Sequence, residues 1–127
     1  MNFKKNTEYL SRRISPEERY EDLLRFPRFI EVETVNVCNA RCPMCTIDDW
    51  ERGAPSIKDN LFKKIADEIV DHADEIHRVS LYRDGEPLID KKMPNRISLL
   101  KDGGIKNVAL STNVSLLNPK KAEDLLH

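Results

Sequence analysis

Three cysteines supply the most distinctive chemistry of this 127-residue chain. Cys38, Cys42 and Cys45 fall within eight residues, and the chain contains no other cysteine. Thiolates at this spacing could hold three corners of an iron–sulfur cube, whereas electron-transfer ferredoxins close each cluster with four thiolates. The fourth iron would stay open to a small molecule. The spacing therefore indicates a cluster that coordinates a ligand rather than one that only carries electrons.

Two other interpretations of the cysteines remain open. Zinc prefers four ligands, and the histidines available as a fourth are His72, His77 and His127. His77 precedes the second predicted strand, which places it at the end of the sheet opposite the cysteines. Plain structural thiols are disfavoured because three cysteines this close together in a polar loop seldom serve packing. An iron–sulfur site is preferred, with a non-catalytic cluster or zinc-binding module, or an inactive fragment, as alternatives.

The elements that must position these cysteines alternate between strands and helices. Ser15 and Pro16 predict the start of an N-terminal helix ending near Phe26. Apolar residues at four-residue steps predict a helix after Ser56, and Gly103-Gly104 is expected to end the next helix, with one of the two glycines in the left-handed conformation. The remaining elements are strands over residues 29–35, 79–82 and 107–111, a helix from about Pro94, and a last helix opening at Asn118-Pro119.

This βαβαβα order predicts an α/β fold with a parallel sheet and right-handed crossovers. In such sheets the loops after the carboxyl ends of the strands gather on one side, where ligands bind. Three suggestive segments fall there: the cysteine run, Gly85-Glu86-Pro87 and Ser111-Thr112-Asn113. We expect them to form one site.

The run Cys38-Asn-Ala-Arg-Cys42-Pro-Met-Cys45, directly after the first strand, resembles the cluster-binding signature of the radical S-adenosylmethionine (radical SAM) superfamily. Gly85-Glu86-Pro87 after the second strand resembles the glycine-rich segment that this family uses to hold the methionine amino group, and Ser111-Thr112-Asn113 also recurs in many members. The chain departs from the pattern at Met44, where the family often has an aromatic residue, and at Asp84, where it often has a glycine.

The resemblance implies a [4Fe-4S] cluster on Cys38, Cys42 and Cys45, with S-adenosyl-L-methionine on the fourth iron. An electron passed to the sulfonium would release a 5′-deoxyadenosyl radical that abstracts hydrogen from a substrate. The implied cofactor-binding residues are Met44, Gly85, Glu86, Pro87, Ser111 and Asn113. The implied partners are a small-molecule or peptide substrate of unknown identity and a one-electron donor such as a flavodoxin or ferredoxin.

The resemblance also sets the expected domain organisation. Residues 1–28 would form a helical extension, and residues 29–127 the first half of a partial (β/α)6 TIM-like barrel. Three units would leave the third strand with an unpaired edge, so we expect a truncated piece of a longer core.

Charge and composition argue against nucleic-acid and membrane partners. The 21 Lys and Arg residues balance 22 Asp and Glu residues and are interspersed with them, and the N-terminus has no long apolar run. A cytoplasmic protein is expected.

Overall fold

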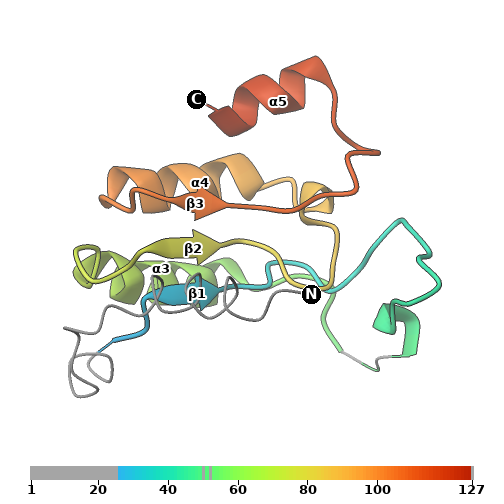
Figure 1. Ribbon diagram of the computed structural model, residues 1–127, viewed down its shortest axis with the longest axis horizontal. Coiled ribbons are helices and arrows are strands. Elements are labelled where there is room, and N and C mark those ends of the chain that lie inside the picture. The colour runs from blue at the N-terminus through green and yellow to red at the C-terminus, as the bar shows by residue number, and fades with distance from the viewer. Residues whose placement is uncertain (1–25, 50, 52, 127) are drawn as a thin grey trace, which may run out of the picture.

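Three short parallel strands form the centre of the molecule. The computed structural model describes residues 26–49, 51 and 53–126, so the helix expected over residues 15–26 lies outside the described residues, apart from Phe26 in a bend. Strands β1 (Phe29–Glu31), β2 (Arg78–Ser80) and β3 (Val108–Ala109) lie in the order β1-β2-β3, all parallel. Figure 1 shows them pointing in one direction. The predicted α/β fold with a parallel sheet is confirmed.

The first strand is shorter than the seven residues expected. The Val32 N–H still donates to the Ser80 carbonyl oxygen, at 2.8 Å, and the chain then leaves the sheet. Val35 instead forms an isolated antiparallel bridge with Ser56, three residues before helix α3 (Asp59–Asp71) begins. The prediction of strand over residues 32–35 was wrong because Thr34 and Val35 pair with residues 56–57 instead of with β2. Strands β2 and β3 are also short, although the Leu81 N–H extends the pairing to Ala109, at 2.9 Å.

Helices α3 (Asp59–Asp71) and α4 (Met93–Asp102) pack against the sheet. The helix predicted after Ser56 begins at Asp59, because Ser56 is engaged in the bridge to Val35. No helix in the described ranges is long and apolar enough to cross a membrane. The buried core joins both helices to the strands and comprises Val32, Phe62, Ala66, Ile69, Ile76, Val79, Leu81, Met93, Leu100 and Ile105.

The two glycines after α4 have different roles. A Cβ atom on Gly103 would lie 2.1 Å from Val70 Cγ2, so Gly103 permits close packing of α4 against α3. Gly104 has a φ of +94°, the left-handed conformation that glycine adopts without strain. The sequence predicted one such residue, and the structure assigns it to Gly104.

Helix α5 (Pro119–Leu126) is the last element. Its start was predicted correctly, since the Lys121 N–H donates to Asn118 Oδ1 at 2.9 Å, an N-cap bond. Figure 1 places α5 beyond β3, on the side of the sheet away from β1. No α5 residue is buried.

Candidate functional site

The cysteine loop, residues 38–45, projects from the carboxyl end of β1. Figure 1 shows this part of the chain reaching out at the edge toward which the strands point. A neck of antiparallel bonds holds it: the Asn36 N–H donates to Pro55 O at 3.1 Å, and the Ile57 N–H donates to Thr34 O at 2.9 Å. The loop therefore leaves and returns at one place beside the sheet.

All three cysteines are unpaired thiols, with Cys42 and Cys45 exposed and Cys38 half-buried. In the part of the chain that the structure describes, no three histidine, cysteine or acidic side chains gather closely enough to hold a single metal ion. A cubane offers a separate iron to each thiolate, so its ligands need not converge on one point. Three reduced thiols in one exposed loop fit the donor chemistry of a cluster better than that of a single zinc ion.

Glu86 is the buried centre of the second loop, with only 2% of its surface exposed. Its Oε1 accepts from the Leu88 N–H at 2.9 Å and from the Thr112 hydroxyl at 2.6 Å. Its Oε2 accepts from the Asn113 N–H at 2.8 Å. We call Glu86, Leu88, Thr112 and Asn113 the carboxylate latch, because one side chain joins the loops that follow β2 and β3.

The same turn also contacts the base of the cysteine loop. The Glu86 N–H donates to the Val37 carbonyl oxygen at 2.9 Å, one residue before Cys38. A Cβ on Gly85 would lie 2.1 Å from Val35 O and 3.1 Å from Val37 O, so only glycine allows this approach of backbone to backbone. Gly85 and Glu86 thus fix where the cysteine loop begins.

The residue before this glycine fits without a second glycine. Asp84 has no positive φ, and its N–H donates to Glu33 Oε1 at 3.2 Å. Arg83 is exposed and forms ion pairs with Glu31, at 3.4 Å, and with Asp84, at 3.3 Å. The departure from the family pattern at Asp84 therefore leaves the backbone unstrained.

The loop after β3 reaches the cysteines through Asn113. Its Nδ2 lies 3.8 Å from Cys38 Sγ and 3.0 Å from Asn39 Oδ1. The structure thus brings together Cys38, Glu86 and Asn113, three residues selected from the sequence. It adds Thr112, Asn39 and Ser115, which our site prediction did not include. Asn39 and Thr112 lie inside the selected motifs, but Ser115 carries no sequence signal.

The other selected residues are placed differently. Met44 is 84% exposed, and Ser111 is also exposed. Pro87 is buried at the first position of the short 3-10 helix η2 (Pro87–Ile89). Glu86 and Pro87 are buried as whole residues, whereas Gly85 is half-buried, so this turn is most accessible at Gly85.

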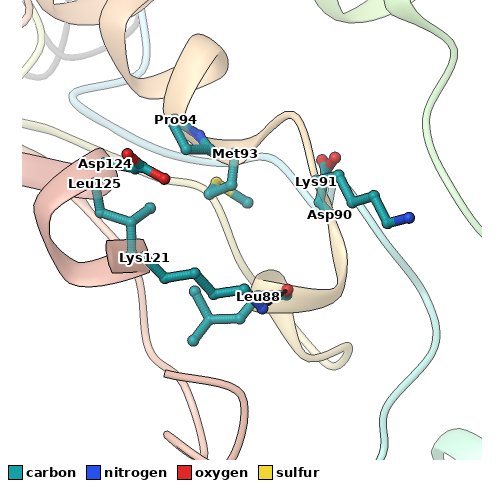
Figure 2. Close-up of a pocket in the computed structure, with 8 residues that line it drawn as sticks. All are labelled: Leu88, Asp90, Lys91, Met93, Pro94, Lys121, Asp124 and Leu125. Atoms are coloured by element: carbon teal, nitrogen blue, oxygen red, sulfur yellow. Dashed lines mark hydrogen bonds between the residues drawn. The ribbon is translucent and has the colours of Figure 1, made fainter. Parts of the chain in front are cut away.

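Two cavities lie near these elements. One, of about 280 Å³, is lined by Cys38, Arg41, Asp48 and other residues at the base of the cysteine loop. Figure 2 shows the other, of about 210 Å³, between η2, the start of α4 and α5. Its lining is largely apolar, from Leu88, Met93, Pro94 and Leu125, and includes no cysteine. The cavity of Figure 2 is therefore a packing gap beneath α5 and lies outside the candidate site.

A family model described as the radical SAM superfamily matches residues 32–127 of the chain. The chain belongs to the radical SAM superfamily. A curated relative from Pyrococcus furiosus, the tungsten-containing aldehyde ferredoxin oxidoreductase cofactor-modifying protein, is 26% identical over 98 residues. That alignment covers 77% of this chain but 27% of the relative. This radical SAM chain thus spans well under half of the curated relative that it matches.

Two solved structures share the fold of this chain. The crystal structure of BtrN in complex with AdoMet and 2-DOIA superposes with a TM-score of 0.70 at 24% identity, over 78% of this chain and 41% of BtrN. A BtrN structure in an open conformation gives a TM-score of 0.69 at 23% identity, over 78% and 44% of the two chains. The three parallel strands and their helices therefore match part of the radical SAM TIM-like fold.

Proposed function

We propose that this radical SAM chain binds a [4Fe-4S] cluster through Cys38, Cys42 and Cys45 and presents its open iron to S-adenosyl-L-methionine. One electron from a low-potential donor, such as a flavodoxin or ferredoxin, would cleave the sulfonium into methionine and a 5′-deoxyadenosyl radical, which abstracts hydrogen from a small-molecule or peptide substrate. The observation that carries the proposal is the contact of Val37 with the loop after β2 and of Cys38 with the loop after β3.

The residues of the chain have separate tasks in this proposal. The thiolates of the cysteine loop hold the cluster, and the flexible thioether of Met44 covers an adenine face. The backbone of Gly85, Glu86 and Pro87 receives the methionine amino group, while the Glu86 carboxylate stays engaged in the latch. Ser111 and Asn113 complete the cofactor side of the site.

Anaerobic reconstitution with iron and sulfide, followed by electron paramagnetic resonance of the reduced protein, tests this function. We expect a [4Fe-4S] signal whose g-values shift when S-adenosyl-L-methionine is added, because the cofactor changes the ligands of one iron. Reductant should then yield 5′-deoxyadenosine, detected by chromatography. A cluster signal that the cofactor leaves unchanged would favour a non-catalytic module. Zinc alone in metal analysis would contradict the proposal.

A further inference from the structure

The orientation of the Asn113 amide is fixed by its neighbours. Its Oδ1 accepts from the Ser115 N–H at 3.0 Å, and a backbone N–H can only donate. The other amide atom must therefore be the nitrogen, and this nitrogen is the atom near Cys38 Sγ, at 3.8 Å. The side chain consequently directs an N–H group at a cysteine sulfur.

A closed ring of hydrogen bonds holds this amide in place. Asn113 Nδ2 donates to Asn39 Oδ1 at 3.0 Å, Asn39 Nδ2 donates to Ser115 Oγ at 2.7 Å, and Ser115 Oγ donates to Asn113 Oδ1 at 2.6 Å. Asn39 directly follows Cys38, whereas Ser115 is 76 residues further along the chain. The ring therefore connects the cysteine loop to the loop after β3 without a bound group.

The backbone around Asn113 is also constrained. Its N–H donates to the buried Glu86 carboxylate, and Val114 has a φ of 57°, which is strained for a β-branched residue. The Val114 N–H donates to Thr112 Oγ1 at 3.0 Å, so the latch supports this path. The chain maintains an unfavourable conformation at the position that aims the amide.

The three cysteine sulfurs differ in their surroundings. Cys38 Sγ receives the Ala40 N–H, at 3.4 Å, in addition to the Asn113 amide. No hydrogen bond from a described residue reaches the sulfur of Cys42 or Cys45. Hydrogen bonds to cluster sulfurs stabilise the more negative reduced state and so raise the reduction potential.

We propose that Asn113 is a positioning residue that donates a hydrogen bond to the Cys38 thiolate and raises the reduction potential of the cluster. This inference rests on the proposed function, since it requires the cluster on the three cysteines. It gives Asn113 a contact with the thiolate in addition to its place on the cofactor side of the site.

Redox titration of the reconstituted chain, monitored by electron paramagnetic resonance without S-adenosyl-L-methionine, tests the assignment. Asn113→Ala keeps the backbone N–H that binds Glu86 and removes the side-chain donor. We expect a roughly threefold loss in the preference for the reduced cluster, a shift of about 28 mV to more negative potential at 59 mV per tenfold change for one electron. Asn107→Ala, which removes an exposed amide at the opposite end of β3, is the matched control and should keep the wild-type potential.

The possible outcomes distinguish a failure of this inference from a failure of the proposed function. A wild-type potential in Asn113→Ala, with a cluster that still responds to S-adenosyl-L-methionine, overturns the role of Asn113 and leaves the proposed function standing. A wild-type chain that assembles no cluster overturns both. If Asn113→Ala does not fold, as judged by circular dichroism, Asn113→Leu keeps a similar size and adds no charge but lacks the donor. Its potential must also be more negative, or the inference is wrong.

Discussion

The two sides of the candidate site are built differently. On one side, Glu86 is buried, with 2% of its surface exposed, and its carboxylate accepts the three hydrogen bonds of the latch. The cysteine loop is open to solvent, and Met44 is 84% exposed. Within this loop, the described backbone hydrogen bond runs from the Cys45 N–H to the Cys42 carbonyl oxygen, at 2.9 Å. One side is assembled by the polypeptide alone. We infer that the other takes its working shape from what the thiols bind.

The largest effect is expected for a change in the cysteine loop. Cys42→Ala should abolish assembly of the cubane, since two thiolates cannot hold three corners. The same change should alter the free energy of unfolding of the metal-free chain by less than about 0.5 kcal/mol, because Cys42 is exposed. Iron and sulfide content measures the first effect and urea denaturation the second. A variant that keeps the full cluster would contradict the ligand assignment.

Removing the Glu86 carboxylate, by contrast, should mainly lower the folding stability of the chain. Glu86→Ala leaves three hydrogen-bond donors without their acceptor, and we expect the free energy of unfolding to fall by about 3 kcal/mol. Glu86→Gln keeps one acceptor oxygen and should lose about half as much. Glu68→Ala, on the exposed face of α3, is the control in urea denaturation. Equal losses for the Glu86→Ala and Glu68→Ala variants would show that the latch does not hold the loops.

The contact between the two sides can be tested at a glycine. Gly85→Ala introduces a Cβ that would lie 2.1 Å from the Val35 carbonyl oxygen, so the backbone must move. We expect a loss of about 2 kcal/mol in the free energy of unfolding. Gly53→Ala is the matched control, because a Cβ there meets no atom within 4 Å. If both variants unfold at the same urea concentration, the turn after β2 does not constrain the cysteine loop.

The smallest effect is expected away from both sides, at Asp59. The hydrogen bond from Lys92, with the charges of Lys92 and Arg96, holds the pKa of the Asp59 carboxyl below its usual range. A carboxyl with a lowered folded-state pKa stabilises the fold above its unfolded pKa, and this contribution is lost as the pH falls through the folded pKa. Asp59 is exposed, so the contribution is small.

Urea midpoints measured between about pH 6 and pH 3 test this point. The wild-type chain should lose slightly more stability on acidification than Asp59→Asn, which has no titrating group at this position. Parallel pH profiles would show that the ion pair with Lys92 contributes nothing to folding.

Local patterns in the sequence predicted much of the fold. The four-residue spacing of Phe62, Ala66 and Val70 predicted α3, and Asn118-Pro119 predicted the start of α5, because both signals act within one turn of helix. The length of β1 was not predictable in this way. Whether Val35 pairs with β2 or with Ser56 depends on a contact across 21 residues, which the β-branched pattern does not encode.

The candidate site shows the same difference between local sequence patterns and long-range contacts. The cysteines and Glu86 were identified because they belong to short motifs. The role of Glu86 in the latch was not, since its partners Thr112 and Asn113 lie 26 and 27 residues away. Sequence patterns located the residues, whereas the pairing of side chains required the fold.

The neck at Val35 and Ser56 has a consequence for how this region can change. Because residues 34–36 and 55–57 are already joined, the ends of the intervening segment stay close together whatever its length. The entropy of closing such a segment rises only slowly as residues are added, by about 0.6 kcal/mol for each doubling. The segment between the two arms of the neck can therefore accept insertions or be exchanged between homologues, while the sheet beneath it keeps its register.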